Sequence, residues 1–160
     1  MDKIVFITGA SSGIGAGCAR KFASQGASLI LNARNVNKLS ALKEELEKQY
    51  GAKIYLLPFD VRDRKAATSA LESLPKEWQS IDILVNNAGL VIGTDKEQEG
   101  SLDEWDIVID TNIKALLAMT RLIVPGMVER KRGHIINIGS IAGDAAYPGG
   151  SVYCVLQRLL

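Results

Sequence analysis

The sequence contains few residues that could bind a metal ion through sulfur or imidazole. Among 160 residues there are two cysteines, Cys18 and Cys154, and one histidine, His134. The cysteines lie far apart, without the close spacing of zinc ligands, and a single histidine leaves too few soft ligands for such a site. We therefore expect no metal centre, and we expect both cysteines to be reduced residues of the core or of helices.

The sequence also lacks an excess of charge and a long apolar run. The net charge is +1, and no basic or acidic block suggests nucleic acid or an anionic membrane surface as a partner. No apolar stretch approaches the roughly 20 residues of a membrane span. The first residues, Met1-Asp2-Lys3, lead into a short apolar segment without the features of a signal peptide. We therefore expect a cytoplasmic protein.

Apolar segments alternate with helical patterns along the chain. With 47% hydrophobic residues, a chain of this length can form one globular domain with a substantial core, which we expect to span residues 1–160. The expected strands are 4–7, 27–31, 54–59, 81–85 and 134–138, and the expected helices are 13–25, 36–50, 63–74, a long helix from 101 and another from 151. This alternation is typical of an α/β protein with a parallel sheet covered on both faces.

A glycine-rich turn, Thr8-Gly9-Ala10-Ser11-Ser12-Gly13-Ile14-Gly15, follows the first apolar segment. Glycine lets the backbone turn sharply and approach a pyrophosphate, and the N-terminus of the next helix favours negative charge. An ordinary strand-to-helix turn also uses glycine, so the turn alone does not decide its role. We predict a phosphate cradle formed by Gly9, Ser11, Ser12, Gly13, Ile14 and Gly15.

Two motifs resemble the short-chain dehydrogenase/reductase family. The glycines are spaced Gly-x-x-x-Gly-x-Gly after Thr8, and Asn86-Asn87-Ala88-Gly89 matches the family's Asn-Asn-Ala-Gly motif residue for residue. The resemblance implies a Rossmann-like, doubly wound parallel sheet with strand order 3-2-1-4-5. It also implies that Asn87, Ala88 and Gly89 brace the central sheet and border the ribose of a dinucleotide cofactor.

Arg34 occupies the position that distinguishes NADP from NAD. About 20 residues beyond the glycines, an acidic residue binds the ribose 2′-hydroxyl of NAD, whereas a nearby Arg accommodates the 2′-phosphate of NADP. No Asp or Glu lies in this window, and although Arg34 could be a solvated loop residue, we predict NADP rather than NAD. Asp60 and Val61 resemble the family's adenine contact, but Asp60 could equally cap the helix that begins near Asp63.

The long helix carries one candidate site residue. Ser101 can cap its start together with Glu104, and Pro125-Gly126 should bend or end it. Its buried stripe is interrupted by Asn112. A buried Asn is usually a satisfied core group, but the resemblance implies a catalytic role, because the backbone at this position holds a water of the family's proton relay.

Ser140 and Tyr153 suit hydride transfer to a carbonyl, which needs a proton donor beside the oxygen and a second donor that polarises it. The resemblance implies that Tyr153 is the acid/base and that Ser140 orients the carbonyl, as in the family's Ser and Tyr-x-x-x-Lys arrangement. A free tyrosine has a pKa of about 10, so work near neutrality needs a lowering of roughly 3 units. In the family, a lysine four residues after the tyrosine helps to lower this pKa, but here that position is Gln157. Arg158 cannot replace the lysine, because it lies about 100° further round the helix.

Three segments look like NADP-dependent 3-hydroxy acid dehydrogenases that oxidise serine or allo-threonine, namely 74–78, 125–130 and 147–150. We therefore expect an NADP-dependent oxidoreductase that interconverts a small secondary alcohol and a carbonyl, and a homodimer or homotetramer for the full-length family. Two alternatives stay open. One is a nucleotide-binding remnant without turnover, and the other is a scaffold subunit that pairs through the long helix with an intact homologue.

The family continues beyond position 160 with further helix, strands and a substrate loop, so we expect this chain to be an incomplete member. The fifth strand would then be an apolar edge, which favours marginal stability and association. A shifted reading frame after Cys154 would explain Gln157, since residues 155–160 can be back-translated so that dropping two bases gives Ala-Ser-Lys-Ala-Ala. That frame restores lysine four residues after Tyr153. A true truncation and a sequencing error are the alternatives.

Overall fold

The computed structural model describes residues 3–93 and 95–159. Residue 160, the last of the segment for which a shifted frame was predicted, lies outside the described residues. Five parallel strands form one sheet in the order β3-β2-β1-β4-β5, which confirms the predicted order.

The strands are β1 (Ile4–Ile7), β2 (Ser28–Leu31), β3 (Ile54–Leu56), β4 (Ile81–Asn86) and β5 (His134–Asn137). The helices are α1 (Gly13–Ser24), α2 (Val36–Tyr50), α3 (Arg64–Glu72), η1 (Lys76–Trp78), η2 (Glu97–Glu99), α4 (Leu102–Ile109), η3 (Asp110–Lys114), α5 (Ala115–Glu129), η4 (Ile141–Gly143) and α6 (Ser151–Leu159).

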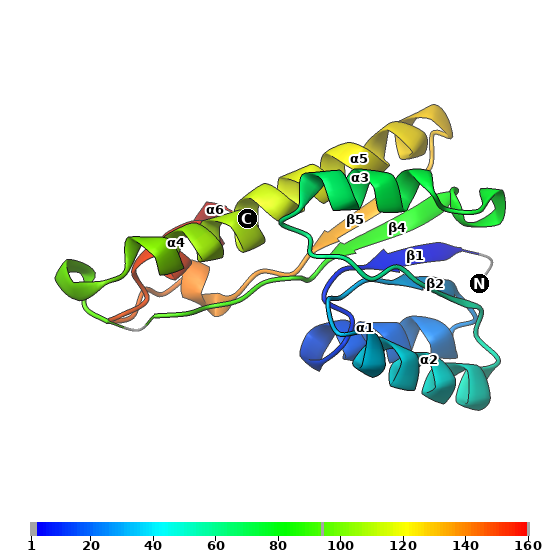
Figure 1. Ribbon diagram of the computed structural model, residues 1–160, viewed down its shortest axis with the longest axis horizontal. Helices are drawn as coiled ribbons and strands as arrows, with labels where there is room; N and C mark the ends of the chain where they lie inside the picture. Colours follow the sequence, from blue (N-terminus) through cyan, green and yellow to red (C-terminus); the bar gives the residue numbers. More distant parts are fainter. Residues whose placement is uncertain (1–2, 94, 160) are drawn as a thin grey trace.

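Helices cover both faces of the sheet, with α1 and α2 on one side and α3 and α5 on the other (Figure 1). Successive side chains of a strand point to opposite faces. Val5 and Ile7 of β1 therefore pack in the cluster under α1 and α2, whereas Phe6 packs in the cluster under α3 and α5. Burial on both faces explains why the central strands are apolar at every position rather than at alternate positions.

The helix α2 matches its predicted bounds because its sequence carries signals at both ends. Asn35 caps the N-terminus, where its Oδ1 accepts a hydrogen bond from the Lys38 N–H at 3.0 Å. Gly51 ends the helix in the left-handed conformation that glycine adopts at low cost, with φ of +63°. Leu39, Leu42 and Leu46 face the core, as their spacing predicts.

The strand β3 is shorter than predicted and ends at Leu56 rather than residue 59. The Leu57 N–H still bonds to the Leu31 carbonyl, and among the described residues it is the last backbone N–H of this segment with a bond to β2. The buried side chain of Asn32 takes over, and its Nδ2 donates to the carbonyls of Leu57 and Phe59 at 3.0 and 3.1 Å. The chain thereby leaves the sheet in a fixed direction toward Asp60.

The long helical stretch after Ser101 has two features that differ from a regular α-helix. Between α4 and α5 the backbone forms the π-helical turn η3, which contains Asn112. The helix α5 then continues through Pro125 to Glu129. Of the two predicted outcomes at Pro125-Gly126, an end of the helix is therefore wrong, and a bend stays a prediction. Because Pro125 has no N–H, the carbonyl of Arg121 loses its helical hydrogen-bond donor. Both residues are exposed, so water can bond to that carbonyl instead.

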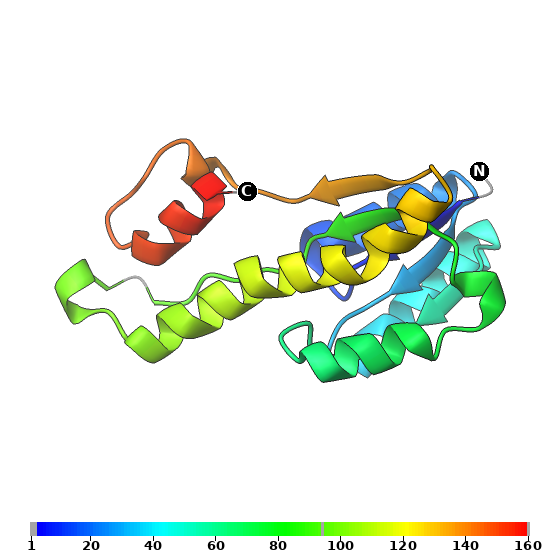
Figure 2. The same cartoon turned by 90° about the horizontal axis from the view of Figure 1, so that it is seen from above.

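The carboxyl ends of β4 and β5 point toward an arm formed by α4, η4 and α6 (Figures 1 and 2). β5 forms the outer edge of the sheet and pairs with β4 alone among the described residues. Within the same described part of the chain, no helix has the length and apolar character needed to cross a lipid bilayer.

Candidate functional site

A cavity of about 950 Å³ opens where the carboxyl ends of the strands meet the arm. Such a position is where open α/β sheets bind ligands. Its volume lies near the upper end of the range for ligand pockets, roughly 300–1,000 Å³. Most of the predicted site residues line it: Gly9, Ser11, Ser12, Gly13, Ile14, Arg34, Asp60, Val61, Asn87, Ala88, Gly89, Asn112 and Tyr153. Segments far apart in the sequence thus form one site.

Two glycines of the turn, Gly13 and Gly15, lie in different surroundings. Gly13 has φ of +52°, and a Cβ there would enter open space, so it leaves room on the cavity side. Gly15 does not line the cavity. A Cβ at Gly15 would collide with the carbonyl of Gly9 and lie 2.5 Å from the Asn87 Nδ2. The missing side chain of Gly15 thus permits close packing inside the fold, and its part in a phosphate cradle stays a prediction.

Hydrogen bonds between Thr8 and the Asn87 segment join the ends of β1 and β4. The Thr8 Oγ1 accepts from the backbone N–H groups of Asn87 and Ala88, both at 3.0 Å. The Asn87 Nδ2 donates to the carbonyls of Thr8 and Gly9 at 2.9 and 3.1 Å. These bonds fix the glycine turn beside Gly89, which is the bracing that the resemblance implied.

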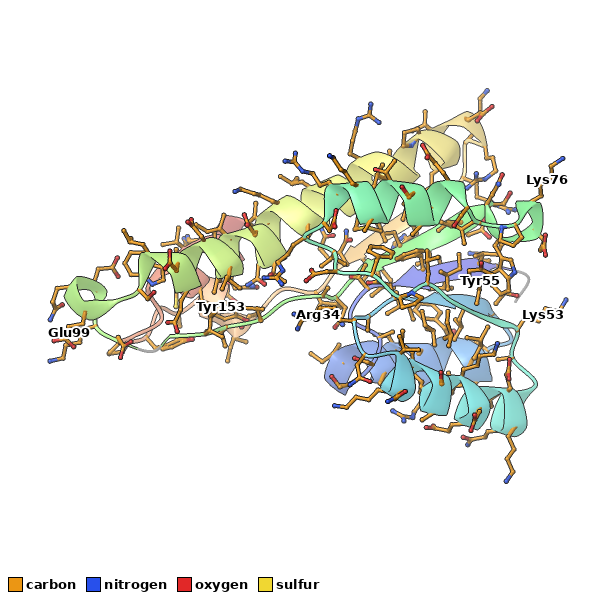
Figure 3. The ribbon with its side chains drawn as sticks, in the orientation of Figure 1. Arg34, Lys53, Tyr55, Lys76, Glu99 and Tyr153 are labelled. Atoms are coloured by element: carbon orange, nitrogen blue, oxygen red, sulfur yellow. The ribbon has the colours of Figure 1, made fainter. Side chains whose placement is uncertain are left out.

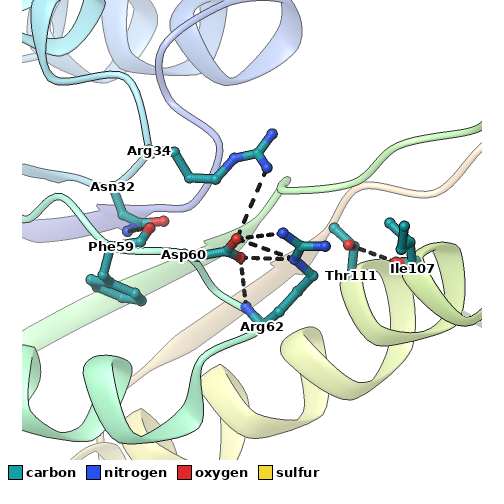
Figure 4. A network of polar contacts seen from close by, with 7 residues as sticks. All are labelled: Asn32, Arg34, Phe59, Asp60, Arg62, Ile107 and Thr111. Atoms are coloured by element: carbon teal, nitrogen blue, oxygen red, sulfur yellow. Dashed lines mark hydrogen bonds and ion pairs between the residues drawn. The ribbon is translucent and has the colours of Figure 1, made fainter.

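Two arginines contact Asp60 at the end of β3 (Figure 4). The Arg62 Nη2 lies 2.6 Å from Oδ2 of Asp60, and its Nε lies 3.1 and 3.2 Å from the two oxygens. The Arg34 Nη1 lies 3.9 Å from Oδ2. The hydrogen bonds from Arg62 are the largest cause that holds the pKa of Asp60 below its usual value, and Arg34 adds to this lowering. The contact with Asp60 in turn raises the pKa of Arg62.

The helix α3 is capped by Asp63, not by Asp60. Asp63 accepts hydrogen bonds from the N–H groups of Lys65 and Ala66, so the capping alternative for Asp60 is wrong.

Asn112 lies in the π-helical turn η3, a feature that often marks functional sites. Both polar atoms of its side chain bond to Leu90: Oδ1 accepts from the Leu90 N–H at 2.9 Å and Nδ2 donates to the Leu90 carbonyl at 2.8 Å. Asn112 therefore ties the chain after Gly89 to the long helix. The role expected for its backbone in a proton relay stays a prediction.

Tyr153 and Gln157 both line the cavity from the helix α6, four residues apart. Figure 3 shows Tyr153 within the arm and Arg34 near the sheet. The Gln157 Oε1 is buried and has no hydrogen-bond partner among the described residues. Arg158 points elsewhere, and its Nη1 donates to the Gly143 carbonyl at 3.3 Å.

Ser140 does not line the cavity, contrary to the expectation that it faces the site. Its Oγ accepts a hydrogen bond from the Ala142 N–H at 3.2 Å and so caps the short helix η4. The neighbouring Gly139 does line the cavity. Serine prefers such local bonds to its own backbone, and that preference explains the orientation.

Sequence reasoning missed two cationic residues of the cavity, Lys38 and Arg62. Lys38 lies in the first turn of α2, where a cation is unfavourable next to the helix dipole unless an anion binds nearby. Because Lys38 follows the Arg34 loop directly in the sequence, it could have been predicted as a residue of the cavity. Arg62 stood two residues after Asp60, but nothing in the sequence fixes which carboxylate an arginine binds.

The match to a family model agrees with this geometry. The model for short chain dehydrogenases matches residues 3–155. The chain belongs to the short-chain dehydrogenase family. The matched range ends before Gln157.

Individual relatives are similar over nearly the whole chain. The NADP-dependent 3-hydroxy acid dehydrogenase YdfG of Escherichia coli O6:H1 is 49% identical over 150 residues, which cover 94% of this chain and 59% of the relative. The crystal structure of serine dehydrogenase from Escherichia coli superimposes with a TM-score of 0.91 at 47% identity, over 98% of this chain and 70% of that one. The closed form of serine dehydrogenase complexed with NADP+ gives a TM-score of 0.90 at 46% identity, over 98% of this chain and 61% of that one. The chain thus spans less than two thirds of the curated relative's length.

Proposed function

We propose that this chain is the cofactor-binding part, with some of the catalytic groups, of an NADP-dependent oxidoreductase. The reaction would interconvert a secondary alcohol and a carbonyl, with a 3-hydroxy acid such as serine or allo-threonine as substrate. The observation that carries the proposal is the cavity that joins the glycine turn, Arg34 and Tyr153. The names of the relatives, a 3-hydroxy acid dehydrogenase and a serine dehydrogenase complexed with NADP+, support it.

The residues of the cavity suit a phosphorylated dinucleotide. Gly13 leaves space at the N-terminus of α1, where free N–H groups favour a pyrophosphate. Arg34 would bind the 2′-phosphate, Asp60 and Val61 would contact the adenine, and Asn87 to Gly89 would border a ribose. The bound dinucleotide would supply the hydride acceptor and donor.

The protein's own groups would manage the proton and the orientation of the substrate. Tyr153 would exchange the proton with the substrate oxygen through its phenolic oxygen. Ser140 would polarise the carbonyl, since its Oγ can still donate its own hydrogen while it accepts from Ala142. For that task the segment around Gly139 would have to turn the hydroxyl into the cavity. The backbone of Asn112 would position a water of the proton relay.

Gln157 favours a second candidate, a protein that binds the dinucleotide without turnover. An uncharged amide cannot stabilise a tyrosinate as an ammonium would. The exposed apolar residues Leu117 and Val128 of α5 support association with a second copy, as a homodimer or homotetramer, or with an intact homologue. The cytoplasmic location stays a prediction.

Dinucleotide binding and turnover, measured separately, test these candidates. We expect isothermal titration calorimetry to detect NADP+ binding, and nicotinamide absorbance to change with serine, allo-threonine or related 3-hydroxy acids. Tyr153→Phe should keep binding and lose turnover. Binding without turnover by the wild-type chain would support the second candidate, and the absence of dinucleotide binding would contradict both.

A further inference from the structure

The carboxylate of Asp60 has two arginine neighbours, which differ in how closely they contact it. Arg62 donates to it from Nε and Nη2, and the backbone N–H of Arg62 adds a bond to Oδ1 at 3.0 Å. The side chain of Arg34 stands 3.9 Å away at its nearest approach and is 68% exposed, against 33% for Arg62. Asp60 is thus firmly bound by Arg62 and only loosely attracts Arg34 (Figure 4).

We propose that Arg62 is a positioning residue for coenzyme selection: by occupying Asp60, it leaves Arg34 free to bind the 2′-phosphate of NADP. This inference rests on the proposed NADP-dependent function. It assigns to Arg62 an effect that is exerted through Asp60 rather than through contact with the cofactor.

Two physical effects support this assignment. First, a carboxylate accepts about four hydrogen bonds, and Arg62 fills most of the capacity that Arg34 would otherwise use. Second, a phosphate monoester carries close to two negative charges near neutral pH, so an uncompensated Asp60 beside Arg34 would repel it. Without Arg62, the carboxylate would both capture Arg34 and repel the phosphate.

Both effects act on NADP and spare NAD, which has a hydroxyl at the 2′ position. The ratio of the two dissociation constants therefore reports the proposed role. Changes in the loop that merely disturb the adenine site would instead weaken both dinucleotides together. The adenine contact expected of Asp60 is common to both cofactors and cancels in the ratio.

The experiment is a double-mutant cycle in which calorimetry gives the dissociation constants of NADP+ and NAD+. Arg62→Leu should lower the preference for NADP+ by about tenfold and leave NAD+ binding within about twofold. In an Asp60→Asn background the same change should alter the preference by less than about twofold, because no carboxylate remains to capture Arg34. Arg62→Lys should keep most of the preference. The control Arg64→Leu, two residues further on and outside the cavity lining, should leave the preference unchanged.

Four results would overturn the proposal. A loss of the same size in the Asp60→Asn background would show that Arg62 contacts the phosphate itself. Parallel weakening of NADP+ and NAD+ would show that Arg62 only supports the loop. If the wild-type chain bound neither dinucleotide, the proposed function would fail together with this inference, whereas a wild-type preference for NADP+ that Arg62→Leu leaves intact would overturn the inference alone.

Discussion

Gly15 and Gly17 lie two residues apart in α1 but differ in their surroundings. Gly15 is buried, and a Cβ there would collide with the Gly9 carbonyl, whereas a Cβ at Gly17 would meet no atom within 4 Å. Gly15→Ala should therefore destabilise the fold by about 1–3 kcal/mol through overpacking. Gly17→Ala should stabilise it by about 0.5–1 kcal/mol, because alanine favours a helix interior. Urea unfolding of both variants measures the contrast, and equal effects would contradict the proposed packing role of Gly15.

We expect residue 157 to decide whether Tyr153 can act as an acid/base near neutral pH. Gln157→Lys would place an ammonium one helical turn from Tyr153, in a position where the Gln157 Oε1 has no described partner. Because a nearby positive charge favours the tyrosinate, turnover at neutral pH should rise by about a hundredfold. The rise in rate toward alkaline pH, expected for the wild-type chain, should become smaller in this variant. The measurement is the pH profile of nicotinamide absorbance change.

The control for this variant is Gln49→Lys, which adds the same charge on the exposed face of α2 and outside the cavity lining. It should leave the rate unchanged. If Gln157→Lys binds NADP+ but gains no activity, residue 157 does not limit the chemistry.

At the scale of elements, Asp82 links β4 to two other segments. Its buried carboxylate accepts from the Ile4 N–H of β1 at 3.0 Å and pairs with the Arg132 Nη2 at 2.7 Å, just before β5. Asp82→Ala should cost about 2–4 kcal/mol, since it leaves the Ile4 N–H without its acceptor and removes a buried charge-assisted bond. Arg132→Ala should cost only about 1 kcal/mol, because Arg132 is mostly exposed and water can replace it.

Urea midpoints of the two variants check this order. Asp82→Asn, which keeps one acceptor oxygen for Ile4, should lie between wild type and Asp82→Ala. An Arg132→Ala variant as unstable as Asp82→Ala would mean that the ion pair, rather than the bond to Ile4, provides the stabilisation.

Elements with local signals at both ends could be predicted closely, and those shaped by tertiary contacts could not. Asn35 and Gly51 fix α2 within the sequence itself. The path of the chain after β3 involves the side chain of Asn32, which follows β2 and bonds to the carbonyls of Leu57 and Phe59. The π-helical turn at Asn112 accompanies bonds to Leu90, 22 residues earlier in the chain, and such partners have no local signature.

At the scale of the whole molecule, the exposed edge strand β5 should promote association. Ile135 on this strand is 37% exposed, and its edge offers unpaired backbone groups. Ile135→Lys should reduce self-association in analytical ultracentrifugation, since an edge charge opposes strand pairing. Val128→Lys on α5 tests the alternative contact surface. A stable monomer with a sharp melt in the unmodified chain would contradict the expected association.

The site as a whole could be predicted from its motifs, but the orientation of individual side chains could not. Thirteen of the predicted residues line one cavity. Eleven of them belong to segments that follow strands whose carboxyl ends share one edge of the sheet, whereas Asn112 and Tyr153 lie on helices. Ser140 bonds instead to its own loop, Gly15 packs inside the fold, and Arg62 binds Asp60. Each of these outcomes depends on neighbours that only the folded chain brings together.

The preference for NADP+ over NAD+ tests the central claim, that this cavity is the coenzyme site of an NADP-dependent oxidoreductase. Calorimetry should show that NADP+ binds at least about tenfold more tightly than NAD+. A tenfold ratio corresponds to about 1.4 kcal/mol, which is modest for a charge-assisted pair between Arg34 and a phosphate. Arg34→Asp should reverse the preference, because a carboxylate repels the 2′-phosphate and accepts a bond from the 2′-hydroxyl of NAD+. An unchanged ratio of the two dissociation constants in Arg34→Asp would contradict the account.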